Sequence, residues 1–183
     1  MTVRQRAWPR QWLMTDERMG ERLWEAIDRL PIKDGGIVFR HYRTPAPARV
    51  ELARRVADIC RERSLVLGMA TDAEFAKALG ADFAHNPSET PVDMPFSRAV
   101  HSLEDAEAAK FEGASLVFVS PLFPTRSHPG AATLDQRLAT HIAKAAGVPA
   151  IALGGMDAIK WAQFKREGFY GWAGIDAWLR TSA

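Results

Sequence analysis

The chain has 183 residues, of which 47% are hydrophobic and 25% charged, a composition typical of one soluble globular domain over residues 1–183. The formal net charge is only +2, and Lys and Arg are not clustered in blocks, so nothing favours nucleic acid as a partner. The start of the chain lacks the apolar core of a signal peptide, no run approaches a membrane span, and the one cysteine, Cys60, excludes an internal disulfide. We therefore expect a cytoplasmic protein with neither nucleic acid nor membrane as a partner.

Short apolar runs alternate with longer amphipathic segments along the chain. The runs predict eight strands, at residues 11–15, 36–40, 65–69, 82–85, 97–101, 115–119, 149–153 and 170–174. The intervening segments predict helices at residues 17–30, 46–63, 72–79, 102–112, 133–146 and 156–167. This alternation is typical of parallel β/α units.

Two parallel architectures fit this order, an open doubly wound sheet and a closed eightfold barrel. No GxGxxG follows the first strand and no GxxxxGK[ST] occurs, so the nucleotide-binding forms of the open sheet lack their fingerprint. A barrel of 183 residues would be a trimmed one, since about 200 or more is usual. The segment NPSETPVDMPF after the fourth strand contains three prolines, which predicts that the fourth helix is missing or reduced to a turn.

Polar side chains gather where the predicted strands end, the edge at which parallel β/α folds bind ligands. Arg40 ends an apolar strand, where an unpaired charge would be costly to bury, so we expect it to contact a ligand or to form an ion pair within the site. Four of the five histidines also fall at this edge: His41, His85, His101 and His128. Each allows a structural interpretation as well. His41 is interpreted as solvated, His85 as a core residue or a ligand contact, and His101 as a bridge between strand and loop or a ligand contact.

The stretch SPLFPTRSHPG (120–130) follows a buried strand and places several hydrogen-bonding side chains before a Pro-Gly turn. A plain surface turn needs only the Pro-Gly pair, so Thr125, Ser127 and His128 predict a loop that holds a ligand.

A second anion signal is PAIALGGM (149–156), a strand that stops at Gly154-Gly155 and opens a helix. Such a turn lets backbone N–H groups approach an anion at a helix N-terminus, and in barrels a phosphate commonly lies between the loops after strands 7 and 8. Gly174 closes strand 8 and supplies the other half of this predicted phosphate site. The alternative is that the two glycines form an ordinary turn.

The sequence lacks the closely spaced His and Cys residues of a zinc site, and it lacks the GxSxG motif of a nucleophilic serine. Magnesium would require carboxylates at the rim, and those available are not paired in sequence.

Several segments taken together resemble one family. QWLMTD, ALGADFAH, AVHSLEDAEAA, SPLFPTRSHPG, PAIALGGM and YGWAGI, in this order and spacing, are similar to the thiamine phosphate synthase / TenI family over about residues 10–178. The resemblance implies a (β/α)8 TIM barrel.

In the synthase members a thiazole phosphate displaces pyrophosphate from a hydroxymethylpyrimidine, with Mg²⁺ on the leaving group. The resemblance therefore implies a phosphorylated thiazole or pyrimidine as ligand, Mg²⁺ as a candidate cofactor, and Glu89 as its candidate ligand. It assigns catalytic roles to Arg40, Ser127, His101 and His128, and substrate or phosphate binding to Thr125, Ser127, Gly154, Gly155, Gly174, His85 and Arg43.

The chain departs from the synthase pattern at several positions. These are Val38 for Gln, Tyr42 for Lys, Ala70-Thr71 for Asn-Asp, Thr90 for a second Asp, His128 for Lys and Asp176 for a hydroxyl. The TenI-type isomerases use a histidine where this chain has Pro121.

Three functions follow as hypotheses. The first is synthesis of thiamine phosphate, with Arg40, Arg43 and His128 in place of the missing lysines. The second is a TenI-like protein that binds thiazole phosphate or thiamine phosphate in a regulatory or salvage role without synthase activity. The third is a different small-molecule reaction in which the rim histidines act as acid and base.

Trp161, Trp172 and Trp178 all fall in the last 23 residues. They predict either an apolar surface for a homo-oligomer or aromatic packing that closes the barrel bottom.

Overall fold

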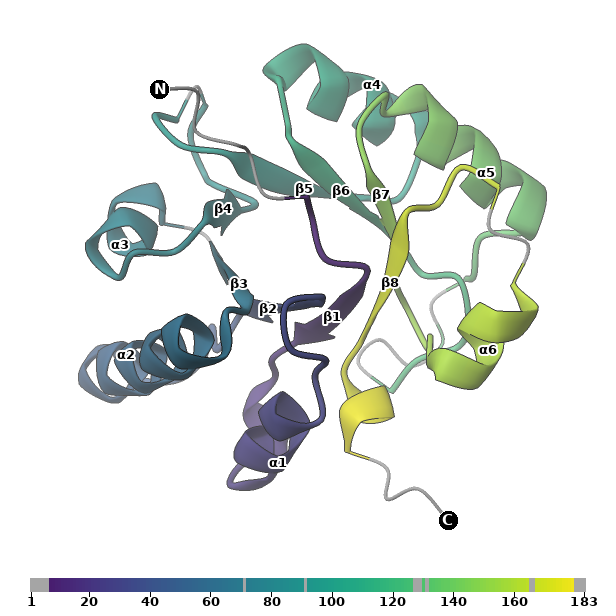
Figure 1. Ribbon diagram of the computed structural model, residues 1–183. Helices are drawn as coiled ribbons and strands as arrows, with labels where there is room; N and C mark the ends of the chain where they lie inside the picture. Colours follow the sequence, from purple (N-terminus) through teal and green to yellow (C-terminus); the bar gives the residue numbers. More distant parts are fainter. Residues whose placement is uncertain are drawn as a thin grey trace.

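Eight parallel strands close into one barrel in the computed structural model, which describes residues 7–70, 72–90, 92–126, 130, 132–164 and 167–179 (Figure 1). Each strand pairs with its neighbours in sequence, and β8 returns to β1. The strands are β1 (Gln11–Met14), β2 (Gly35–Phe39), β3 (Val66–Ala70), β4 (Phe83–His85), β5 (Phe96–Val100), β6 (Leu116–Val119), β7 (Ala150–Ala152) and β8 (Gly171–Gly174). The predicted barrel and the order of its strands are confirmed.

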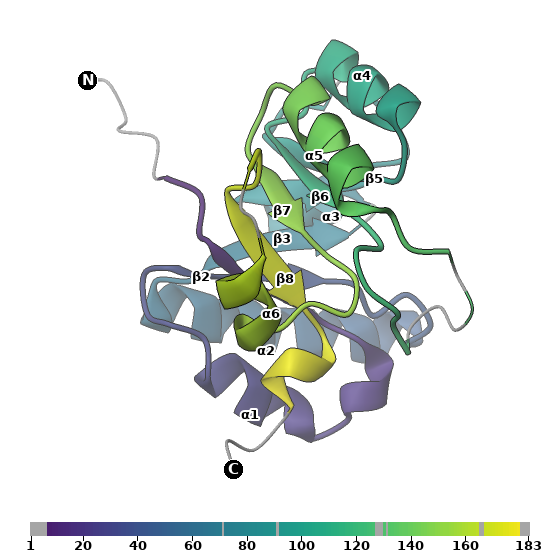
Figure 2. The ribbon, with the colours of Figure 1, turned by 90° about the vertical axis from the view of Figure 1, so that its right-hand side faces the viewer.

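Helices cover the outside of the barrel (Figures 1 and 2). They are α1 (Arg22–Asp28), α2 (Ala46–Arg63), α3 (Ala73–Ala78), α4 (Leu103–Glu112), α5 (Gln136–Ala145) and α6 (Ala158–Gln163), with 3₁₀ turns η1 (Glu17–Met19) and η2 (Asp176–Trp178). Residues 86–90 and 92–95, between β4 and β5, contain no helix, as their prolines predict. No helix of the described residues is long and apolar enough to cross a membrane.

Capping side chains fix where several helices begin. Asp72, Ser102, Asp135 and Asp157 each accept a backbone N–H from the first turn of the following helix. The helix predicted over residues 17–30 is instead broken into η1 and α1, because Gly20 takes a left-handed φ of 50° between them.

The barrel interior is packed by large aromatic rings against glycines. Trp12 and Phe83 are fully buried and meet edge to face, with ring centroids 5.7 Å apart. A Cβ on Gly36 would lie 2.4 Å from the Trp12 ring, and one on Gly68 would lie 2.2 Å from the Phe83 ring. The two glycines therefore make the space that the two rings fill.

The tryptophans near the C-terminus pack between β8 and α1. Trp172 and Trp178 are buried and stacked, with ring centroids 5.1 Å apart, and the Trp178 indole donates to the Trp12 carbonyl at 3.0 Å. Arg29, the C-cap of α1, donates to the Trp178 carbonyl at 2.6 Å. The predicted apolar surface is thus wrong for these two residues, which belong to the layer between barrel and helices. A homo-oligomer stays a prediction without their support.

Candidate functional site

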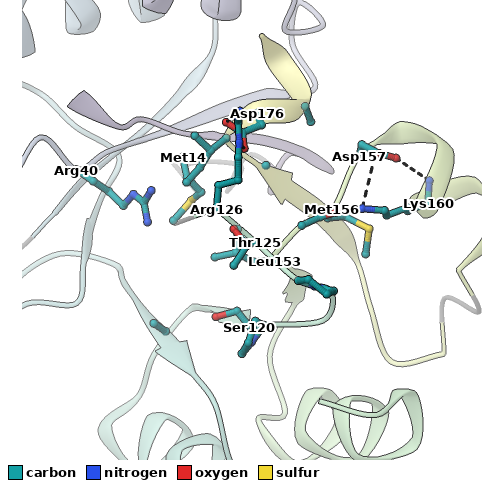
Figure 3. Close-up of a pocket in the computed structure, with 18 of the residues that line it drawn as sticks. Met14, Arg40, Ser120, Thr125, Arg126, Leu153, Met156, Asp157, Lys160 and Asp176 are labelled. Carbon is teal, nitrogen blue, oxygen red and sulfur yellow. Dashed lines mark hydrogen bonds and ion pairs between the residues drawn. The ribbon is translucent and has the colours of Figure 1, made fainter. Parts of the chain in front are cut away.

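A cavity of about 590 Å³ opens at the carboxyl ends of the strands (Figure 3). Its wall comes from β1, β2, β4 and β5 on one side and from the turns after β6, β7 and β8 on the other. Seven residues expected at the site lie in this wall: Arg40, His85, His101, Thr125, Gly154, Gly155 and Gly174.

Four other expected residues are not found in the wall. Arg43 is exposed, and its backbone N–H donates to Glu17 at 2.7 Å. Glu89 lines a separate depression between α3 and the segment after β4. Ser127 and His128 lie outside the described residues.

Arg40 points toward the middle of the cavity from the end of β2 (Figure 3). Its Nε donates to the Thr15 carbonyl at 3.1 Å, and a terminal nitrogen lies 4.0 Å from Asp16. Burial lowers the pKa of Arg40, while Tyr42 and Asp16 oppose the shift. Arg40 therefore has a long ion pair with Asp16, which itself does not line the cavity.

Asp16 is also held by Arg18, whose Nε and second terminal nitrogen lie 2.8 and 3.0 Å from the two carboxylate oxygens. Burial alone would raise the pKa of Asp16, but the hydrogen bonds from Arg18 and the charge of Arg40 lower it. Asp16 is thus an ionised, arginine-bound carboxylate beside Arg40.

His85 forms the floor of the cavity. Its Nδ1 lies 2.8 Å from the Ser97 hydroxyl, and its ring packs edge to face on Phe118. Burial lowers the pKa of His85 to about 3, so the ring is neutral near pH 7. Every fully buried side-chain nitrogen or oxygen of the described residues has a hydrogen-bond partner, so the unpartnered Nε2 faces the cavity.

His101 bridges the ends of β5 and β6, as one of its two interpretations states. Its Nδ1 lies 2.8 Å from the Ser120 carbonyl, and because a carbonyl only accepts, Nδ1 carries the hydrogen. In the neutral ring this leaves Nε2 as the nitrogen with a lone pair. His101 also lines the cavity, so contact with a ligand stays a prediction for it.

His41 is not solvated, which corrects its sequence interpretation. The ring is 5% exposed, stacks on Phe39 at 4.8 Å and places Nδ1 2.9 Å from the Thr15 hydroxyl. It lies behind the cavity wall and does not line it.

The Gly154-Gly155 turn packs tightly against the loop after β6. Both glycines have left-handed φ, 91° and 59°. A Cβ on Gly154 would lie 2.6 Å from Pro121, and one on Gly155 would lie 2.4 Å from the Pro124 carbonyl. Glycine is thus needed here both for the backbone conformation and for close approach.

Lys160 lies at this turn and was not expected from the sequence. Its ammonium group donates to the Gly155 carbonyl, lies 3.9 Å from Asp157 and sits over the Phe123 ring at 5.0 Å. Asp157 caps α6 three residues earlier, so one helical turn carries Lys160 back toward the glycines. An Asp-x-x-Lys after the Gly-Gly pair is the sequence signal that would have found it.

Arg126 and Asp176 also line the cavity and form an ion pair. The Arg126 Nε and a terminal nitrogen lie 2.9 and 2.8 Å from the two Asp176 oxygens. The hydrogen bonds from Arg126 lower the pKa of Asp176 against the effect of its burial. The carboxylate that stands where a hydroxyl was expected is thus neutralised by an arginine from another loop.

The profile of the TMP-TENI family, described as thiamine monophosphate synthase, matches residues 13–178. The chain belongs to the thiamine monophosphate synthase family. Among curated relatives, it is 29% identical over 185 residues to a protein of Aquifex aeolicus provisionally assigned as thiamine-phosphate synthase 2, covering 93% of this chain and 98% of that one. It is also 29% identical over 180 residues to thiamine-phosphate synthase of Roseiflexus castenholzii, covering 91% and 79%.

Solved structures agree on the fold of this family member. The thiamine phosphate pyrophosphorylase of Pyrococcus furiosus superposes with a TM-score of 0.78 at 22% identity, over 92% of this chain and 86% of that one. A 3-hexulose-6-phosphate synthase superposes with a TM-score of 0.61 at 14% identity, over 92% and 90%. Likenesses at this identity establish the barrel alone.

The Mg²⁺ that the thiamine monophosphate synthase family implies does not fit the two carboxylates that line the cavity, Asp157 and Asp176. Asp176 is bound by Arg126, while Asp157 caps α6 beside Lys160. No three His, Cys, Asp or Glu side chains of the described residues are grouped as metal ligands. Mg²⁺ sites need carboxylates that can turn to the ion, and these two are held by other groups.

Proposed function

We propose that the cavity binds a phosphorylated thiazole or thiamine phosphate. The observation that supports this most is the convergence of three cations, Arg40, Arg126 and Lys160, on one cavity that also contains the Gly154-Gly155 turn. Cations attract a phosphate, and the Gly154-Gly155 turn, which packs on the loop after β6, brings backbone into the same wall.

The remainder of the wall suits a heterocycle. Met14, Leu153, Ile175 and Pro124 offer apolar surface, and neutral His85 turns one ring nitrogen to the cavity. His101, whose Nδ1 is bonded to the Ser120 carbonyl, lines the same wall. A thiazole or pyrimidine combines flat apolar faces with ring nitrogens and substituents that hydrogen-bond. In this proposal Arg40 and Lys160 attract the anion, the glycine turn forms the wall beside it, and the two histidines orient the ring.

Calorimetry tests this binding directly. Thiamine phosphate and hydroxyethylthiazole phosphate are titrated into the protein, with thiamine and hydroxyethylthiazole as matched ligands that lack the phosphate. We expect the phosphorylated member of each pair to bind at least about tenfold more tightly, the size expected for charge-assisted hydrogen bonds. Equal binding within both pairs, or no binding, would contradict the proposal.

Synthesis of thiamine phosphate is a second candidate, favoured by family membership and by the placement of Arg40 in the wall. Mixing the protein with pyrimidine pyrophosphate, thiazole phosphate and Mg²⁺ and measuring thiamine phosphate tests it. Product above the background without protein supports this candidate. If the product does not exceed that background but the phosphorylated ligands bind tightly, the protein binds them without synthase activity, in a regulatory or salvage role.

A further inference from the structure

The regular hydrogen-bond ladder between β1 and β2 is interrupted where β2 reaches the cavity. The ladder begins regularly, with Met14 paired to Val38 and the Thr15 N–H donating to the Val38 carbonyl at 2.9 Å. The next bond of a regular parallel ladder would join the Arg40 N–H to the Thr15 carbonyl.

That next bond goes to a side chain instead. The Arg40 N–H donates to the Thr15 hydroxyl at 2.9 Å. The Thr15 carbonyl, relieved of the backbone donor, accepts from the Arg40 Nε at 3.1 Å. The hydroxyl thus replaces the carbonyl in the ladder, and the carbonyl holds the guanidinium group.

His41 completes the arrangement. Thr15 is fully buried, and its hydroxyl oxygen already accepts from Arg40, so its hydrogen needs an acceptor. His41 Nδ1 lies 2.9 Å away and supplies that acceptor when the ring carries its hydrogen on Nε2. The stack on Phe39 and the bond from Arg49 to the His41 carbonyl at 3.0 Å keep the ring in place.

We propose that Thr15 and His41 are positioning residues that aim the Arg40 guanidinium into the cavity by exchanging the backbone acceptor of β1 for a hydroxyl. Neither residue lines the cavity, so neither touches the ligand. The expected effect on ligand affinity rests on the proposed function. The replacement of the Thr15 carbonyl by its hydroxyl as acceptor for the Arg40 N–H is a property of the protein without ligand.

The deciding experiment compares T15V with T15S. Valine keeps the shape of threonine without its hydroxyl, so in T15V the Arg40 N–H can return to the carbonyl of residue 15 and the ladder becomes regular. We expect T15V to fold with nearly unchanged melting temperature but to release the Arg40 Nε–H. NMR of the arginine side chains then shows faster solvent exchange of that Nε–H in T15V, and wild-type exchange in T15S.

A second pair of variants tests the role of His41. Asn in H41N can present its amide oxygen near the position of Nδ1, whereas H41L leaves the Thr15 hydroxyl without an acceptor. We expect H41N to keep the slow exchange of the Arg40 Nε–H and H41L to lose it. The NMR carbon chemical shifts of the wild-type His41 ring should show that its hydrogen is on Nε2.

Thiamine phosphate affinity gives the functional readout. We expect T15V and H41L to bind about tenfold more weakly and T15S and H41N within about twofold of wild type, since one charge-assisted contact is at stake. Equal Nε–H protection in T15V and T15S, or an Nδ1–H form of His41, would overturn the inference. If wild-type protein binds neither phosphorylated ligand, the proposed function fails. The solvent exchange of the Arg40 Nε–H and the tautomer of the His41 ring still decide this inference.

Discussion

Arg126 and Asp176 stand 50 residues apart in sequence and form a two-point ion pair in the cavity wall, with contacts of 2.9 and 2.8 Å. The pair joins the loop after β6 to the turn after β8. It also means that a phosphate in the cavity competes with Asp176 for Arg126.

Replacing Asp176 with Asn removes a negative charge from the wall and frees Arg126. We expect D176N to bind thiamine phosphate about threefold or more tightly, with a steeper dependence on salt, because like charges repel and exposed pairs are screened. Calorimetry at two salt concentrations measures both. D58N is the matched control, since Asp58 pairs with Arg61 on α2 outside the cavity. Weaker binding by D176N than by D58N would contradict this prediction.

His85 should make folding stability depend on pH. The folded pKa of about 3 lies below the ordinary value of 6.5, so between these values the unfolded chain binds more protons. Stability from this residue is therefore complete above about pH 6.5 and is lost as the pH falls toward 3. We expect wild type to lose about 2 kcal/mol more than H85N between pH 7 and 4.5, measured by urea unfolding. Identical losses would show that burial of His85 is not the cause.

The glycine turn after β7 should not tolerate a side chain. G155A places a Cβ 2.4 Å from the Pro124 carbonyl at a φ of 59°. G113A is the matched control, because Gly113 has a φ of 82° with open space around it. We expect G113A to cost about 1 kcal/mol from backbone strain and G155A at least about 2 kcal/mol, with loss of phosphate binding. Equal costs in thermal unfolding would remove the packing argument.

Inside the barrel, Gly68 and Phe83 should behave as a coupled pair. A Cβ on Gly68 meets the Phe83 ring at 2.2 Å, so G68A is expected to destabilise by about 2–3 kcal/mol. F83L alone removes buried ring surface, and in the double variant the smaller side chain leaves room for the new methyl group. A double-mutant cycle by denaturant unfolding should show a coupling of at least about 1 kcal/mol. Strict additivity would mean that the two residues do not share the space.

Local sequence signals were sufficient for the elements and for much of the cavity wall. Apolar runs located all eight strands because buried parallel strands are apolar on both faces. The prolines after β4 correctly predicted the missing helix. Resemblance to the family, rather than periodicity, selected the closed barrel, whereas the ends of the predicted strands placed Arg40, Thr125 and Gly155 at the rim.

The sequence by itself determined the strands, the edge at which they end and the residues that lie there, because these depend on hydrophobic pattern and on strand direction. Only the tertiary structure decided which charges and hydroxyls meet. Arg126 finds Asp176, Lys160 turns back onto Gly155, and the Thr15 hydroxyl enters the ladder beside His41. Barrel closure and helix capping bring these groups together, and hydrogen bonds act over about 3 Å, a distance that spacing along the chain does not encode.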